Sequence, residues 1–180
     1  SESVIRNADL ALYAAKDGGR GRSHFYSSDL HSRAEERNQM EQDLRDAIAN
    51  GELQLFYQPV VRAATEQISG FEALLRWRHP VHGWLSPAKF IPVAEDTGLI
   101  ATIGEWALRT ACQDLARWPE EVRCAVNVSP LQFANPQFAA IVTNAIAQAN
   151  VDPARLELEI TENVFLNDDQ GTDAMFAALK

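Results

Sequence analysis

The sequence predicts an α/β fold built on a largely parallel β-sheet. From Gly51 onward, short stretches that alternate apolar and polar residues are followed by stretches with apolar residues at helical spacing. Strands that alternate with helices form βα units, and such units place their strands parallel. The first two predicted strands are an exception. Only a short polar turn joins them, so they are predicted to pair antiparallel.

The elements after Gly51 follow one another in a regular order. The predicted strands cover residues 53–60, 68–77, 122–128 and 156–160. The predicted helices cover residues 86–95, 99–118, 136–150 and 173–180. Ser86 followed by Pro87 favours a helix start, because serine caps free backbone amides and proline fits the first turn.

The residues before Gly51 predict a separate organisation. Residues 8–16 have helical spacing, glycines 18, 19 and 21 predict a turn, and residues 23–26 form a strand candidate. One helix, a turn and one strand are too few to bury a hydrophobic core. They are therefore predicted to belong to a domain that extends upstream. Residues 31–50 predict a charged helix with a narrow apolar stripe. We therefore divide the chain into residues 1–28, a connecting segment at 29–50, and a second domain at 51–180.

Composition and charge exclude several classes of protein. The net charge is −9 at pH 7, whereas proteins that bind nucleic-acid duplexes carry a basic surface, so a duplex partner is excluded. The sequence contains neither a run of about 18 apolar residues nor a signal-peptide pattern, which predicts a cytoplasmic chain and leaves open a membrane anchor elsewhere in a parent protein. Cys112 and Cys124 lie in apolar stretches and are predicted to be buried, reduced thiols.

The predicted strands carry polar residues toward their ends. Reading each strand at period two gives one apolar face and one face with the polar residues Gln58, Glu72, Arg76, Asn127 and Glu159. Parallel barrels carry their active sites at the carboxyl ends of the strands, so these side chains are predicted to converge. Carboxylate and amide oxygens suit a hard cation such as Mg²⁺ or Mn²⁺, and arginine suits a phosphate. The alternative is a set of solvated charges at strand ends.

Six short motifs in this region occur in a fixed order. They are Tyr57-Gln58-Pro59, the stretch FEALLRW at 71–77, the stretches SPAKFIP and AEDTGLI within 86–100, Asn127-Val128-Ser129, and Glu159-Ile160-Thr161-Glu162. Together they resemble the EAL family of cyclic di-GMP phosphodiesterases, over residues 43–180. Residues 8–22 are similar to the close of a GGDEF domain, and the tandem order GGDEF–EAL is common.

The resemblance implies a modified TIM-type (β/α) barrel that hydrolyses the second messenger cyclic di-GMP to linear pGpG in bacterial signal transduction, with two Mg²⁺ or Mn²⁺ ions. Carried over by position, the metal ligands are Glu72, Asn127 and Glu159. Glu72 is also assigned to catalysis, together with Glu162, which is similar to a glutamate that steadies a loop beside the site.

The residues carried over as substrate contacts are Gln58, Leu74 and Arg76, with Arg76 on a phosphate. The family's paired aspartates, its lysine and a later glutamate lie beyond Lys180. The resemblance therefore implies about the first half of a barrel, with an incomplete metal site and little activity from this chain alone. Asp168-Asp169 lacks the Phe-Gly-Thr-Gly context of that pair and is interpreted as a helix cap.

Two other functions stay open at this point. One is a receptor that binds cyclic di-GMP without hydrolysis, and the other is an interaction module that forms a homodimer through the EAL domain. Among the remaining features, His79 and His82 are interpreted as structural histidines rather than zinc ligands, and Glu95-Asp96 as a solvated helix end. The four tryptophans are interpreted as packing residues rather than a platform for stacked bases.

Overall fold

The computed structural model of the chain describes residues 28–160 and 170–179. It divides the chain into two compact units, Ser1–Asp43 and Leu44–Lys180. Helix α2 (Ser28–Ala47) begins in the first unit and ends in the second. The elements predicted within residues 8–26 lie outside the described residues, and the domain boundaries stay predictions.

Helix α2 begins and ends three residues earlier than the sequence predicts. Its end is set by a turn in which Gly51 has a φ of 68°, a conformation that costs glycine little because it lacks a Cβ. The amide of Gly51 donates to the carbonyl of Ile48 in this turn. In the second unit, Leu44 and Ala47 near the end of the helix are fully buried.

The second unit contains the predicted strands and helices in the predicted order. The strands are β1 (Leu53–Val61), β2 (Ile68–His79), β3 (Gly83–Leu85), β4 (Arg123–Val128) and β5 (Leu156–Ile160). The helices are α3 (Pro87–Asp96), α4 (Leu99–Leu115), α5 (Pro130–Phe133), α6 (Phe138–Ala149) and α7 (Gln170–Ala178), with a 3₁₀ turn at Pro153–Arg155. Strand β3 and helix α5 are not among the sequence predictions, because elements of three and four residues are too short to show a period.

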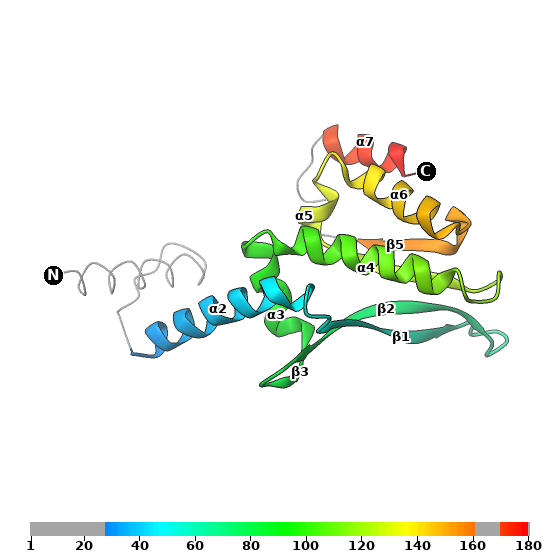
Figure 1. Ribbon diagram of the computed structural model, residues 1–180. Coiled ribbons are helices and arrows are strands. Elements are labelled where there is room, and N and C mark those ends of the chain that lie inside the picture. Colours follow the sequence, from blue (N-terminus) through cyan, green and yellow to red (C-terminus); the bar gives the residue numbers. More distant parts are fainter. Residues whose placement is uncertain (1–27, 161–169, 180) are drawn as a thin grey trace. The chain divides into compact units, whose positions relative to one another are not determined.

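The strands form one sheet in the order β1-β2-β4-β5, and β3 pairs with β2 (Figure 1). The β1–β2 pair is antiparallel, which confirms the prediction from the short turn. The β2–β4 and β4–β5 pairs are parallel, as βα connections require. The carboxyl ends of β2, β4 and β5 therefore point the same way.

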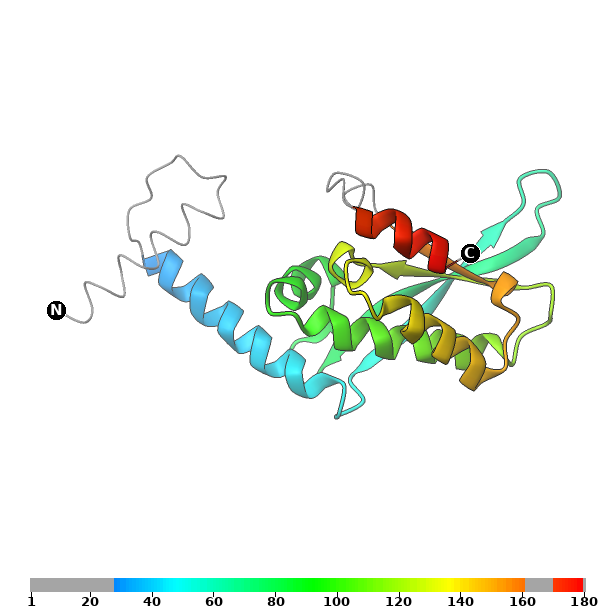
Figure 2. The same ribbon diagram turned by 90° about the horizontal axis from the view of Figure 1, so that it is seen from above.

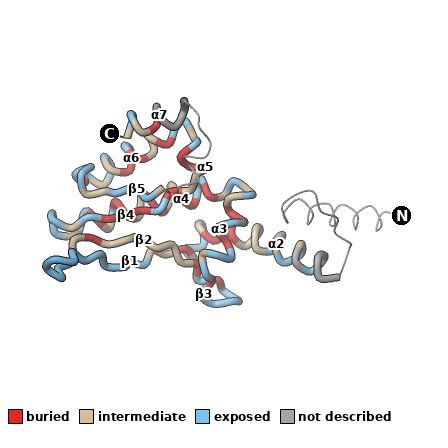
Figure 3. The backbone as a smooth tube through the Cα atoms, turned by 180° about the vertical axis from the view of Figure 1, so that it is seen from behind, coloured by how far each residue is buried: buried red, intermediate tan, exposed pale blue. Residues whose placement is uncertain are grey.

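Helices α4, α6 and α7 lie on one face of this sheet (Figure 1 and Figure 2). The main core forms between these helices and the sheet, and buried residues gather where α4 faces β4 (Figure 3). Cys112 and Cys124 are both buried there as free thiols, which confirms the sequence prediction. Burial raises the pKa of the Cys112 thiol to about 11 and that of Cys124 to about 12.

Helix α4 ends at Leu115, three residues short of its predicted end. The side chain of Arg155 donates to the backbone carbonyl of the last helical residue and to carbonyls of the turn that follows. Its acceptors are the carbonyls of Leu115, Trp118, Pro119 and Val122. Among the residues that the structure describes, no helix combines the length and the apolar character needed to cross a bilayer.

Candidate functional site

The strand register brings the three predicted metal ligands to one face of the sheet. Glu72 of β2 is level with Ala125 of β4, and Asn127 of β4 is level with Glu159 of β5. The amide nitrogen of Asn127 donates a 2.7 Å hydrogen bond to the carboxylate Oε1 of Glu72. Neighbouring strands therefore contribute one side chain each to a single cluster.

The electrostatics of the cluster are dominated by negative charge. Burial raises the pKa of the Glu159 carboxyl, and the charges of Glu72 and Glu157 raise it further. Glu157 lies level with Ala125 and pairs with the guanidinium of Arg123 at 3.1 Å. The sequence places Glu157 on this face but gives it no role. Of the three carboxylates on this face, Glu157 thus has an arginine partner. Among the described residues, Glu72 and Glu159 form no such ion pair.

The donors present suit a hard cation. Glu72 and Glu159 offer carboxylate oxygens, and the Asn127 carbonyl oxygen remains an acceptor while the amide nitrogen holds Glu72. Residues 28–160 and 170–179 contain no cluster of three His, Cys, Asp or Glu side chains arranged to hold a metal. The described donor set is thus two carboxylates and one amide, which fits the chemistry of Mg²⁺ or Mn²⁺ but supplies only part of a six-oxygen shell.

The predicted substrate contacts share the same face. Gln58 of β1 pairs directly with Glu72, and Leu74 follows Glu72 by one period of the strand. Arg76 lies one period further along, where its guanidinium donates a 2.8 Å hydrogen bond to the Leu75 carbonyl. The predicted role of Glu162 concerns a residue outside the described part of the chain.

The loop that follows Asn127 is fixed by a network that the sequence reasoning missed. The hydroxyl of Ser129 donates a 2.7 Å hydrogen bond to Glu95, so this half-buried carboxylate at the end of α3 also has a structural role, while Asp96 beside it is exposed. Ser129 also caps α5, and the side chain of Gln132 accepts from the Ser129 amide at 3.2 Å. The Ser-x-x-Gln spacing at 129–132 is a capping-box signal that could have revealed part of this network.

The structural interpretation of His79 agrees with its surroundings. His79 is 5% exposed, and its Nδ1 accepts the backbone amides of Val81 and His82 at 3.1 and 3.2 Å.

The interpretation of the tryptophans as packing residues holds for two examples. Trp77 is fully buried, and Trp118 packs edge-on against Tyr57. Trp84 packs edge-on against Phe56, and 51% of it remains exposed.

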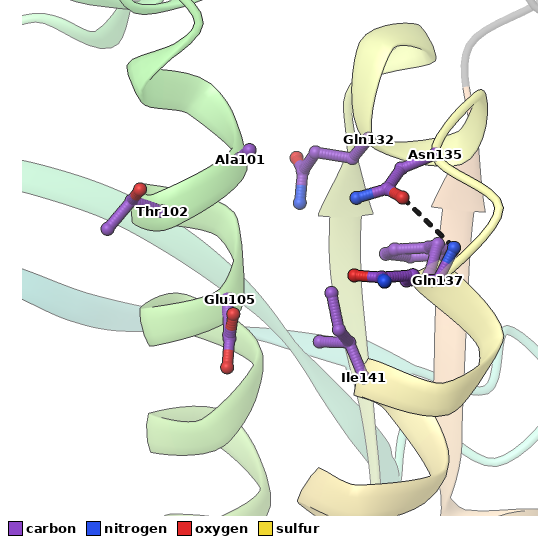
Figure 4. Close-up of a pocket in the computed structure, with 8 residues that line it drawn as sticks. Ala101, Thr102, Glu105, Gln132, Asn135, Gln137 and Ile141 are labelled. Atoms are coloured by element: carbon purple, nitrogen blue, oxygen red, sulfur yellow. Dashed lines mark hydrogen bonds between the residues drawn. The ribbon is translucent and has the colours of Figure 1, made fainter.

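A hollow of about 180 Å³ lies in the helical layer, between α4 and the segments of α5 and α6 (Figure 4). Its lining is mostly polar and includes Thr102, Glu105, Gln132 and Asn135. These groups have partners within the fold: Glu105 pairs with Arg109 at 2.7 Å, and the Asn135 side chain accepts the Gln137 amide at 2.9 Å. These polar groups of the hollow are therefore engaged within the helical layer. The carboxylates of Glu72 and Glu159 lie on the other face of the sheet.

Comparison with known proteins shows the family to which the chain belongs. A sequence model of the EAL domain matches residues 41–180. An uncharacterized signaling protein of Caulobacter vibrioides is 46% identical over 170 residues, which are 94% of this chain and 21% of that protein. MucR of Pseudomonas aeruginosa, described as a bifunctional diguanylate cyclase/cyclic di-GMP phosphodiesterase, is 43% identical over 169 residues, or 92% of this chain and 25% of MucR.

A solved structure gives the same result at the level of the fold. The structure of the PaMucR phosphodiesterase in complex with c-di-GMP matches with a TM-score of 0.75 and 41% sequence identity. The match covers 78% of this chain and 59% of that chain. The chain spans between a fifth and a quarter of the length of the two curated relatives.

Proposed function

The chain belongs to the EAL domain family, and on that premise we propose that it is part of a metal-dependent phosphodiesterase domain that hydrolyses cyclic di-GMP to linear pGpG. The observation that carries the proposal is the cluster of Glu72, Asn127 and Glu159 on three adjacent strands, joined by the 2.7 Å bond from Asn127 to Glu72. MucR, which is similar to this chain, supports the choice of substrate through the activity in its name.

Each residue of the cluster has a distinct part in the proposal. Glu72, Asn127 and Glu159 would hold Mg²⁺ or Mn²⁺, and such ions when bound neutralise phosphate charge and acidify a water molecule. Asn127 also restrains the Glu72 carboxylate through its amide nitrogen, so the two donors keep a fixed relation before any ligand arrives. Burial, and after it the charges of Glu72 and Glu157, raises the pKa of Glu159, and a bound cation would favour the charged carboxylate against both effects.

The substrate contacts act through binding. Arg76 offers a planar pair of donors to a phosphate oxygen, and Gln58, paired with Glu72, offers an amide on the neighbouring strand. Leu74 supplies an apolar surface between them. Glu162 is proposed to steady a loop beside the site, from the resemblance alone.

The test uses the parent protein, with whatever sequence follows Lys180, and follows conversion of cyclic di-GMP to pGpG by chromatography. We expect turnover with Mg²⁺ or Mn²⁺ and its loss when a chelator removes the metal. The 180-residue chain alone is expected to turn over little, because its described donors are two carboxylates and one amide. A parent protein that binds cyclic di-GMP and never cleaves it would establish a receptor instead.

We extend the proposal to the setting of the domain. Residues 1–28 are proposed to be the end of a GGDEF-like domain, and the similarity to a bifunctional diguanylate cyclase and phosphodiesterase supports this tandem order. The site is proposed to work in the cytoplasm, and a homodimer formed through the EAL domain is a further proposal. Sedimentation of the parent protein with and without cyclic di-GMP tests the dimer directly.

A further inference from the structure

Two large aromatic side chains stay exposed on β1 and β3, the two strands that pair antiparallel with β2. Phe56 of β1 is 46% exposed and Trp84 of β3 is 51% exposed. Their rings pack edge to face, with centroids 5.2 Å apart and an interplanar angle of 67°. Among the described tryptophans, Trp84 thus differs from Trp77, which is fully buried.

The strand register assigns both aromatic residues to the face that carries Glu72. Phe56 pairs with Leu74, and Trp84 pairs with Arg78, so both partners lie an even number of residues from Glu72 on β2. One period of a strand is ~7 Å, and Phe56 lies one period from the level of Glu72. A flat ring on Phe56 and a phosphate near Glu72 can therefore belong to one nucleotide.

A cation accompanies the aromatic pair. The guanidinium carbon of Arg76 lies 5.7 Å from the centroid of the Phe56 ring. Aromatic rings next to an arginine match a nucleotide, because the rings stack on the base while the guanidinium binds the negatively charged phosphate. Along β2 the face changes from carboxylate at Glu72 to apolar at Leu74 and cationic at Arg76.

We propose that Phe56 and Trp84 form a stacking surface for one purine base of the cyclic dinucleotide, a binding role that rests on the proposed function. Trp84 presents the exposed ring and Phe56 supports it from the side. Stacking uses the face of a base and not its hydrogen-bonding edges, so this surface adds affinity without choosing between guanine and adenine.

The test compares Trp84→Ala and Trp84→Phe in the parent protein, with Val81→Ala as the matched control. Val81 belongs to the same hairpin and is 79% exposed, so its variant removes apolar surface without removing a ring. We expect Trp84→Ala to raise both KM and the directly measured Kd for cyclic di-GMP about tenfold, since one stacked base contributes on that order. The kcat should change less than about twofold, and Trp84→Phe should restore most of the affinity.

Two further readouts separate stacking from other roles. Binding of cyclic di-GMP should quench tryptophan fluorescence in the wild type and much less in Trp84→Phe. The ratio of affinities for cyclic di-GMP and cyclic di-AMP should be the same in wild type and Trp84→Ala. Circular dichroism and thermal unfolding establish that each variant is folded.

The outcomes are distinct. Unchanged Kd and quenching in a folded Trp84→Ala variant would overturn the stacking surface and leave the proposed hydrolysis intact. A loss of self-association in Trp84→Ala, with affinity for cyclic di-GMP retained, would assign the surface to contact between copies and overturn the proposal. A wild-type parent protein that neither binds nor cleaves cyclic di-GMP would overturn both the stacking surface and the proposed function.

Discussion

The hydroxyl of Ser129 joins the end of α3 to the loop after β4 by its 2.7 Å hydrogen bond to the Glu95 carboxylate. Asn127 lies two residues earlier, and its amide reaches across to Glu72. The bond between Ser129 and Glu95 therefore holds the chain at the point where β4 delivers a predicted metal ligand. Two of the predictions below concern this network.

Ser129→Ala is expected to lower the free energy of unfolding by ~1 kcal/mol, because it removes the helix cap and leaves Glu95 without this donor. Ser129→Thr keeps a hydroxyl and should retain most of the stability. Urea unfolding of the three proteins measures the effect. Equal stability of Ser129→Ala and wild type would show that the capping bonds are not needed.

Gly104→Ala tests the close approach of α4 to Gln132. A Cβ on Gly104 would lie 1.8 Å from the Gln132 amide nitrogen, so the Gln132 side chain must move and release the Ser129 amide. The displaced atoms are the far end of a flexible side chain, so we expect a loss of ~1 kcal/mol in unfolding free energy, mainly from the released bond to the Ser129 amide. The double variant Gly104→Ala/Gln132→Ala has no such clash. Adding Gly104→Ala to Gln132→Ala should therefore cost little stability.

Glu72→Ala and Arg76→Ala are expected to affect different kinetic constants of the parent protein. Glu72→Ala deletes a charged donor and should lower kcat for cyclic di-GMP at least ~100-fold. Arg76→Ala removes the proposed phosphate contact, and a charge-assisted bond of ~1.5–3 kcal/mol there would raise KM ~10- to 100-fold when lost. Initial rates over a range of substrate and metal concentrations separate the two. Arg62→Ala, in the turn between β1 and β2, is the control for losing an exposed arginine.

Arg155→Ala is expected to destabilise the fold by ~2–3 kcal/mol, because its guanidinium donates to several backbone carbonyls at the end of α4 and in the turn after it. Arg155→Lys should recover only part of this loss, since a single ammonium cannot reproduce the fork of donors. Arg117→Ala is the control. Its pair with Asp114 at 3.3 Å is exposed on the arginine side, and such pairs contribute little. Thermal unfolding should therefore separate Arg155→Ala clearly from Arg117→Ala.

The cysteines predict a loss of stability at alkaline pH. Burial raises the pKa of Cys112 from 9.0 to about 11 and of Cys124 from 9.0 to about 12. A folded-state pKa above the unfolded one means that the folded thiol binds its proton more tightly. The contribution of each thiol to the free energy of unfolding is therefore complete below pH 9. It falls as the pH rises toward the pKa of the folded state.

Urea unfolding between pH 8 and about 11 should show this decline, with a shallower slope in the variant Cys112→Ala/Cys124→Ala. Iodoacetamide at pH 8 should label the thiols of the wild type only after unfolding. Rapid labelling of the folded protein would contradict the burial of both groups.

Local sequence patterns were sufficient to predict most of the fold. Alternation and helical spacing located the long elements, and the short turn before Ile68 predicted the antiparallel first pair, because these features depend on nearby residues. Two features depend on partners far along the chain. Arg155 donates to the last carbonyl of α4 from 40 positions away, and Glu95 contacts Ser129 across 34 positions. No local pattern reports such contacts.

The site was predictable in part for the same reason. The parity of each strand correctly grouped Glu72, Asn127 and Glu159 on one face, since side chains alternate along a strand. The stagger between strands, which sets the level of each residue, arises from pairing and could not be read from one sequence. The exposure of Trp84 was missed because β3 has only three residues. Glu162 and residues 1–27 stay predictions.

The antiparallel pairing of β1 with β2 also implies an order of assembly during folding. The hairpin closes a short loop, so Gln58, Phe56 and Arg76 can reach their places beside Glu72 early, at a small cost in chain entropy. The bond from Asn127 to Glu72 spans 55 positions, so it closes a much longer loop and is expected to form later. We therefore expect substitutions in the hairpin to slow refolding and substitutions at Asn127 to speed unfolding. In a nascent chain, the surface proposed to receive the nucleotide takes shape before the carboxylate cluster is complete.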